Sequence, residues 1–193
     1  MKKKIIVAIT GASGSIYGIR LLEILKTIDA IETHLILSPS GALTAQHELS
    51  IDKHSIAKLA DVVHQPKDIG ATLSSGSFIT HGMVIAPCSM KTLACIAHGI
   101  ADNLVSRAAD VVLKERRKLI LMVRETPLNS IHLRNMLTLT EMDAIIAPPV
   151  PAFYTHPSTI DDIVNHTVGR ILDSLDIPPN DYVRRWPGLN PLK

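Results

Sequence analysis

Aromatic residues are scarce in this sequence, because two Phe, three Tyr and one Trp make up only 3% of its 193 residues. They do not alternate with basic residues, which argues against a platform that stacks single-stranded nucleic acid. The charge is nearly balanced, at 20 basic and 18 acidic side chains. A clustered basic excess, the usual footprint of a nucleic-acid binder, is therefore also missing. We expect no nucleic-acid partner.

Long apolar runs are missing as well. None reaches the ~18 residues that a membrane helix needs. Lys2–Lys4 gives the positive start of a signal peptide, but the apolar run over 5–9 is too short and 11–14 reads as a turn. Two cysteines, Cys88 and Cys95, are too few for a disulfide scaffold. With no H-E-x-x-H or paired C-x-x-C pattern either, we expect a cytoplasmic protein with neither a membrane span nor a metal site.

The sequence does contain a regular alternation of strands and helices. Apolar, β-branched runs at 4–9, 33–37, 83–86, 119–123 and 144–147 alternate with amphipathic patterns, the clearest over 158–175. This spacing predicts a three-layer α/β fold with a doubly wound parallel sheet, Rossmann-like or flavodoxin-like. No composition break marks a second domain, so 1–193 is predicted to be one domain, with an irregular tail over about 178–193.

Several local features are predicted with this fold. The strand over 83–86 should stop at Pro87, and Thr126–Pro127 should open a helix. Ser158 with Asp161 resembles a capping box. Residues 65–82, rich in Gly, Ser and Thr, read as a loop that could carry binding groups.

Small and polar residues follow the predicted strands, at the edge where such sheets bind ligands. The turn 11–15 and the segment 89–92 can each present backbone N–H groups to a phosphate. Ser38 and Ser89 could equally be simple helix caps. Arg124 beside Glu125 is either a local ion pair or a phosphate clamp next to a general base.

Other candidates have equally plain structural roles. Arg107, Asp110 and Lys114 share one helix face and could form a solvated ion-pair ladder. Tyr154 could pack in the interior or bind an anion, and Arg170 could reach into a cleft beside its helix. Cys88 is interpreted as a structural thiol, since no histidine and carboxylate pattern supports a nucleophile.

Taken together, these motifs resemble the UbiX-type flavin prenyltransferases, some formerly named phenolic acid or 3-octaprenyl-4-hydroxybenzoate decarboxylases. The resemblance covers nearly the whole chain. It rests on T-G-A-S-G at 10–14, P-C-S-x-x-T at 87–92, the block from Asn103 to Pro127, Phe153–Tyr154 and Arg170.

The resemblance implies a metal-independent transferase that acts on reduced FMN and dimethylallyl phosphate. The prenyl group would be joined to N5 and C6 of the flavin, and the prenylated FMN would pass to a UbiD-type decarboxylase in aromatic acid decarboxylation, for example in ubiquinone biosynthesis. It further implies a homododecamer built from trimers, with flavin sites at the subunit interfaces.

The same resemblance assigns roles to individual residues. It implies flavin contacts from Gly11, Ala12, Ser13, Ser38, Ser89, Met90, Lys91, Thr92 and Arg124. It implies a clamp for the prenyl phosphate from Arg124, Lys114, Tyr154 and Arg170, joined by Arg107 at a subunit contact and Trp186 in the closing tail. Ser13, Glu48 and Glu125 would be the catalytic residues, with Ser13 relaying a proton near N5 and Glu125 acting as acid and base.

Two alternative functions remain open at this point. One is an FMN-dependent cysteine decarboxylase-like enzyme, although the P-x-M-N-x-x-M-W segment of that group is missing. The other is a non-catalytic FMN-carrier subunit of an aromatic acid decarboxylase. A carrier needs the flavin-binding turns but not the set of cations at Lys114, Arg124 and Arg170.

Overall fold

The computed structural model describes residues 2–188. Within them, six strands form one parallel sheet in the order β3-β2-β1-β4-β5-β6. The strands are β1 (Lys3–Ile9), β2 (Ile31–Leu37), β3 (Val62–His64), β4 (Gly82–Cys88), β5 (Lys118–Val123) and β6 (Ile145–Ile146). This is the strand order of a Rossmann-like sheet.

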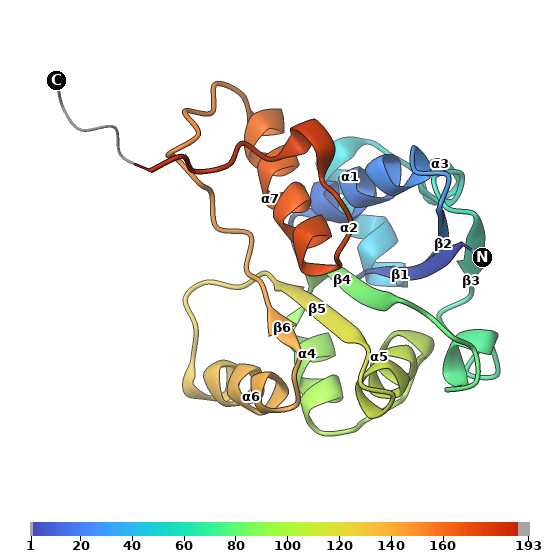
Figure 1. The fold of residues 1–193 in the computed structure, drawn as a ribbon. Helices are drawn as coiled ribbons and strands as arrows, with labels where there is room; N and C mark the ends of the chain where they lie inside the picture. Colours follow the sequence, from blue (N-terminus) through green and yellow to red (C-terminus); the bar gives the residue numbers. More distant parts are fainter. Residues whose placement is uncertain (1, 189–193) are drawn as a thin grey trace, which may run out of the picture. The chain divides into compact units, whose positions relative to one another are not determined.

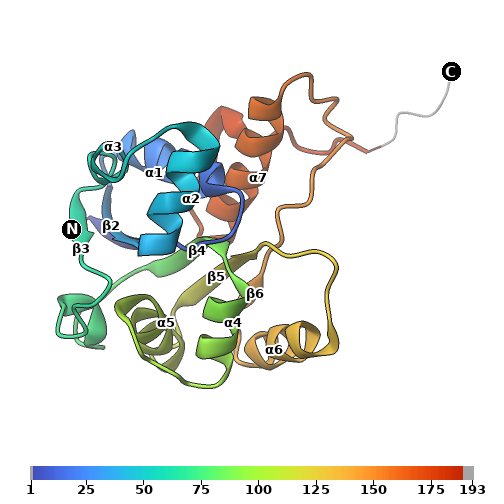
Figure 2. The same ribbon diagram turned by 180° about the vertical axis from the view of Figure 1, so that it is seen from behind.

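Helices connect the strands and cover the sheet on both faces (Figures 1 and 2). The helices are α1 (Ser15–Lys26), α2 (Pro39–Leu49), α3 (Lys53–Ala57), α4 (Met90–Ala97), α5 (Leu104–Lys114), α6 (Ser130–Glu141) and α7 (Ile160–Ser174), with 3-10 turns η1 (Thr72–Ser74) and η2 (Asn180–Tyr182). Helices α1 and α2 lie on one face, and α4, α5 and α6 lie on the other. The predicted three-layer α/β fold is confirmed.

The central strands are apolar along their whole length because both of their faces are covered. Residues 5–9 of β1 are at most 1% exposed. On the α5 face, Met83 and Ile85 of β4 pack with Leu119 and Leu121 of β5 in one buried cluster. This core fixes the ends of β1, β4 and β5, and so the loops that follow them.

The chain forms two compact units, one ending at Pro149 and one beginning at Val150. The first holds the sheet and α1 to α6. The second holds α7 and η2, where a side chain at Gly169 would collide with Val183, so the segment after η2 packs directly on α7. The single domain over 1–193 stays a prediction, and part of its predicted tail, 189–193, lies outside the described residues.

Three local predictions were wrong. Strand β4 runs through Pro87 to Cys88, because a register shift between Ile85 and Cys88 accommodates a residue without an N–H. Helix α6 begins at Ser130, since the side chain of Asn129, not Thr126, caps it.

The capping box of α7 lies one residue later than predicted. It pairs Thr159 with Asp162, because the Thr159 hydroxyl accepts from the Asp162 N–H. Strand β3 was not predicted at all. Val62 and Val63 are 36% and 46% exposed at the sheet edge, so they lack the pattern of a buried strand.

Candidate functional site

The strand order reverses between β1 and β4, and ligands bind at such a reversal in open α/β sheets. A pocket of about 540 Å³ lies at the carboxyl ends of these strands. It is lined by Thr10, Gly11, Ser38, Pro39, Ser40, Pro66, Lys67, Ser89, Lys91, Thr92, Cys95, Asp102, Asn103, Val105 and Ser106. The structure therefore brings together five of the nine predicted flavin contacts: Gly11, Ser38, Ser89, Lys91 and Thr92.

The turn after β1 passes close to the start of α2. A side chain at Gly11 would collide with the Cβ of Ser40, so only glycine allows this approach. Gly14 has a φ of 99°, in the left-handed region that favours glycine. Both glycines of the predicted turn are thus required by the backbone path itself.

Glu48 occupies the N-terminus of α1, where Gly14 provides no side-chain cap. Its carboxylate accepts hydrogen bonds from the backbone N–H groups of Gly14 and Ser15, each at 3.0 Å. Partial burial raises the pKa of Glu48, but these bonds and one from the Ser13 hydroxyl outweigh it, so the pKa lies below its usual value. The site thus places an anion of its own at this helix end, and any ligand phosphate must bind elsewhere.

Thr10 ties the loop after β1 to the loop after β4. Its hydroxyl donates to the Pro87 carbonyl at 2.7 Å and accepts from the Ser89 N–H at 2.9 Å. The sequence pattern alone gave Thr10 no role, although it directly follows the first predicted strand. It fixes the spacing between two walls of the pocket.

Helix α4 begins at the pocket with the predicted cap. The Ser89 hydroxyl accepts from the Thr92 N–H at 3.3 Å and contacts the Thr92 hydroxyl at 3.1 Å. Met90 is partly buried against the apolar core and is not among the residues that line the pocket. The residues at the starts of α2 and α5 also line the pocket, which brings the positive ends of three helices together.

Arg124 and Glu125 follow β5 at the same edge of the sheet. The Arg124 N–H donates to the Cys88 carbonyl at 3.2 Å, which fixes the backbone of one loop beside the other. Burial raises the pKa of Tyr17 in α1, and the positive charge of Arg124 partly opposes this rise. Both side chains are exposed, and within residues 2–188 Glu125 accepts only a local bond from the Thr126 N–H at 3.1 Å.

Lys114 lies at the far end of α5 from the pocket. The helix starts beside the pocket and ends ten residues later, roughly 15 Å away at 1.5 Å per residue. The Lys114 amine donates to Glu115 at 2.5 Å, so the predicted link from Asp110 to Lys114 is replaced by this pair. Arg107 does pair with Asp110, at 2.6 Å.

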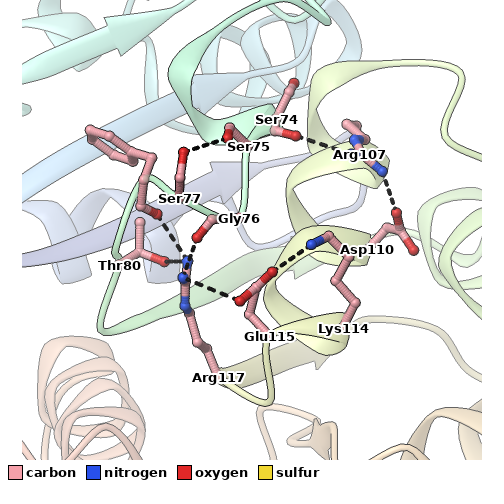
Figure 3. A network of polar contacts seen from close by, with 11 residues as sticks. Ser74, Ser75, Gly76, Ser77, Thr80, Arg107, Asp110, Lys114, Glu115 and Arg117 are labelled. Atoms are coloured by element: carbon pink, nitrogen blue, oxygen red, sulfur yellow. Dashed lines mark hydrogen bonds and ion pairs between the residues drawn. The ribbon is translucent and has the colours of Figure 1, made fainter.

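The loop 74–80 is held against α5 by two arginines (Figure 3). Arg107 donates to the Ser74 carbonyl at 3.1 Å. Arg117 donates to the carbonyls of Gly76 and Phe78, at 2.6 and 2.9 Å, and pairs with Glu115 at 3.8 Å. The bonds to the loop carbonyls were missed because they join residues 33 to 41 positions apart.

In the second unit, Tyr154 lies between two rings. Its hydroxyl is 3.2 Å from Nε2 of His166, and Trp186 packs edge-on at 5.4 Å. Arg170 pairs with Asp173 at 2.7 Å, and its positive charge lowers the pKa of His166. Three predicted substrate contacts, Tyr154, Arg170 and Trp186, therefore belong to one unit.

Comparison with known proteins identifies the family. The family model described as Flavoprotein matches residues 1–172. Flavin prenyltransferase UbiX of Salmonella typhimurium is 54% identical over 187 residues, which is 96% of this chain and 99% of that protein. This chain belongs to the UbiX-type flavin prenyltransferases, within the flavoprotein family.

Solved structures of UbiX proteins have the same fold. A dodecameric FMN-dependent UbiX-like decarboxylase from Escherichia coli is 52% identical, with a TM-score of 0.94 over 96% of this chain and 100% of that one. AnUbiX (PadA1), in complex with FMN and dimethylallyl pyrophosphate, is 47% identical, with a TM-score of 0.96 over 98% and 100% of the two chains.

The structure also bears on the Cys88 thiol, on metal binding and on membrane spans in this UbiX-type chain. Burial raises the pKa of the Cys88 thiol to about 12, as expected for a structural cysteine. Within residues 2–188, no three His, Cys, Asp or Glu side chains are grouped to hold a metal ion. Nor does any helix in that range have the length and hydropathy to cross a membrane.

Proposed function

We propose that this protein transfers the dimethylallyl group of dimethylallyl phosphate to N5 and C6 of reduced FMN. The observation that carries the proposal is full-length identity of 54% to a UbiX flavin prenyltransferase. The pocket at the β1–β4 reversal supports it independently, because turns that match the family's flavin-binding motifs meet there.

The pocket fits a flavin mononucleotide in size and in chemistry. Its volume of about 540 Å³ falls within the ~300–1,000 Å³ usual for small-molecule sites. Hydroxyls of Ser38, Ser89 and Thr92, the amine of Lys91 and three helix N-termini suit a phosphate and a polar ring edge. Gly11, Ala12 and Ser13 supply a turn without bulky side chains.

The role of proton acceptor is assigned to Glu125 rather than Glu48. Bound reduced FMN supplies the nucleophilic nitrogen and carbon. The prenyl C–O bond would break as N5 bonds to C1 of the prenyl group. The second bond would form between C6 and C3 as the prenyl alkene takes up a proton at C2, and the proton lost from C6 must pass to a base. Glu48 is a poor base because three donors already stabilise its charge, whereas Glu125 accepts only the local Thr126 N–H.

The departing phosphate is assigned to a clamp of Lys114, Arg124, Tyr154 and Arg170. Phosphate leaves with negative charge, which cations and a phenol hydroxyl can stabilise. Lys114 lies roughly 15 Å along α5 from its own pocket, so we assign it, with Arg107, to the site of a neighbouring copy. A homododecamer built from trimers, like the dodecamer solved for the Escherichia coli relative, provides such neighbours. Trp186 packs on Tyr154 and helps to close the site.

Delivery of prenylated FMN to a UbiD-type decarboxylase, in the cytoplasm, completes the proposal. It is supported by the sequence resemblance, which pairs this chemistry with a decarboxylase partner.

The decisive experiment is anaerobic mass spectrometry of the flavin after incubation of the protein with reduced FMN and dimethylallyl phosphate. A gain of one prenyl unit, absent without protein, is expected. Dimethylallyl pyrophosphate, the ligand in the AnUbiX structure, should be tested in parallel. FMN that stays bound but unmodified with both would indicate a carrier instead.

A further inference from the structure

His166 is a buried polar residue of α7 with no role so far. It is only 7% exposed. Its Nε2 lies 3.2 Å from the Tyr154 hydroxyl, and the two rings meet edge to face with centroids 5.6 Å apart. Tyr154, by contrast, is 42% exposed, so it can reach a ligand while His166 cannot.

The surroundings of His166 favour its neutral form. Burial lowers the pKa of the imidazole, and the positive charge of Arg170 lowers it further. A neutral imidazole carries one N–H, on either Nδ1 or Nε2. Which nitrogen carries it decides the direction of the bond to Tyr154.

The other ring nitrogen resolves this choice. Nδ1 of His166 is buried and has no hydrogen-bond partner among the side chains and backbone that the structure describes. A proton there would leave a buried N–H donor unpaired, which is rarer and more costly in proteins than an unpaired acceptor. The proton therefore belongs on Nε2, where it points at the Tyr154 oxygen.

We propose that His166 is a positioning residue, which donates from Nε2 to the Tyr154 oxygen and so turns the phenol proton toward the prenyl phosphate. With the opposite tautomer, Tyr154 would donate to His166 and present lone pairs to an anion. The inference rests on the proposed function, in which Tyr154 contacts that phosphate. It adds a residue that acts through Tyr154 without touching the substrate.

Two substitutions of His166 separate the donor from the bulk of the ring. In His166→Gln, the amide can place an N–H near the position of Nε2. In His166→Asn, the amide reaches only the position of Nδ1, so the bond to Tyr154 is lost. We expect His166→Asn to raise KM for dimethylallyl phosphate about tenfold or more, and His166→Gln to stay within about threefold, with FMN affinity unchanged in both.

The Tyr154→Phe background distinguishes positioning from general stability. If His166 acts through the hydroxyl, His166→Asn has no further effect on KM once that hydroxyl is gone. An equal loss in both backgrounds would show that His166 only supports the fold of its unit, and would overturn the proposal.

The tautomer can be measured in the unaltered protein. Solid-state ¹⁵N NMR of the histidine-labelled protein, with the His166→Gln variant to assign the signal, should show Nε2 protonated and Nδ1 unprotonated. The reverse tautomer would overturn the proposal whatever the kinetics of the variants. Wild-type protein that leaves FMN unmodified would instead overturn the proposed function, and the phosphate role of His166 with it.

Discussion

At the scale of single residues, the two candidate catalytic carboxylates differ in how many hydrogen bonds they already accept. Glu48 accepts from two backbone N–H groups at the start of α1, whereas Glu125 is exposed and accepts from one. Glu125→Gln should lower kcat about 100-fold or more, the usual contribution of a general base, with FMN affinity unchanged. Glu48→Gln should instead weaken FMN binding and lower Tm, because the turn 13–15 loses its charged acceptor.

Anaerobic single-turnover kinetics and flavin titration of both variants test this division of roles. The Glu125 assignment is wrong if its variant turns over normally. A Glu48→Gln variant that binds FMN tightly but no longer turns over would move the base to Glu48.

At Gly18, helix α1 lies so close to the sheet that no side chain fits between them. A side chain at this position would collide with the Ala86 carbonyl of β4 and come within 2.9 Å of Ile9 Cγ1. Because backbone cannot yield as a flexible side chain can, Gly18→Ala should destabilise the protein by about 1–3 kcal/mol, despite the better helix propensity of Ala.

Gly70→Ala is the matched control for Gly18→Ala. Its added carbon would meet only Asp68 Oδ1 at an ordinary 3.5 Å. Thermal unfolding at equal protein concentration should separate the two variants. Equal Tm values would mean that α1 moves freely away from β4.

At the scale of elements, the N-terminus of α7 depends on one carboxylate. Asp162 accepts from the Ser158 N–H and hydroxyl and from the Thr159 N–H, each at 2.9 Å. These bonds lower the pKa of Asp162 from 3.8 to about 2. A folded-state pKa below the unfolded one stabilises the protein above about pH 4, and this stabilisation is lost as pH falls through 2.

Asp162→Asn should therefore lower Tm near neutral pH, and the gap to wild type should narrow between pH 4 and 2. Fluorescence of Trp186, the one tryptophan in the sequence, reports on the same unit. Asp143→Asn is the control, because its ion pair with Arg116 is highly exposed and contributes little. A difference in Tm that does not change with pH would show that the charge of Asp162 does not contribute to stability.

The elements themselves were largely predictable, while their ends were not. The alternation of apolar runs and helical stripes located β1, β2, β4, β5 and most helices, because burial on two faces leaves a pattern in the sequence. Edge strand β3 left none, since Val63 is half exposed. Asn129 and Thr159 cap their helices. Nearby Thr126 and Ser158 have side chains that are equally suited to capping, so the sequence spacing predicted the wrong capping residue in both helices.

At the scale of the whole molecule, the predicted site divides into three groups. One surrounds the pocket, one lies at the far end of α5, and one lies in the second unit. Hydrogen-bond partners such as Gly76 and Phe78 for Arg117 depend on the folded chain, and no spacing rule could supply them. The flavin turns were predictable because each directly follows a strand.

If Lys114 serves a neighbouring copy, two inactive variants should restore activity together. Lys114→Met removes the amine, and Arg124→Met removes the guanidinium. In oligomers mixed from equal amounts, each site draws Arg124 from one chain and Lys114 from another, so about one site in four is intact. Co-expressed variants should then regain about a quarter of wild-type prenylation, while each alone stays inactive.

Arg116→Met is the matched control for Lys114→Met, since Arg116 is exposed and pairs only weakly with Asp143, at 3.6 Å. It should keep full activity alone and, mixed equally with Arg124→Met, give about half of wild-type prenylation, because about half of the sites then keep Arg124. Because a site built within one chain cannot be repaired by another copy, mixed oligomers without activity would place Lys114 and Arg124 in the same chain's site. Within one chain, Lys114 lies roughly 15 Å along α5 from the pocket. Recovery of activity would therefore establish that the far end of α5 completes the pocket of a neighbouring copy.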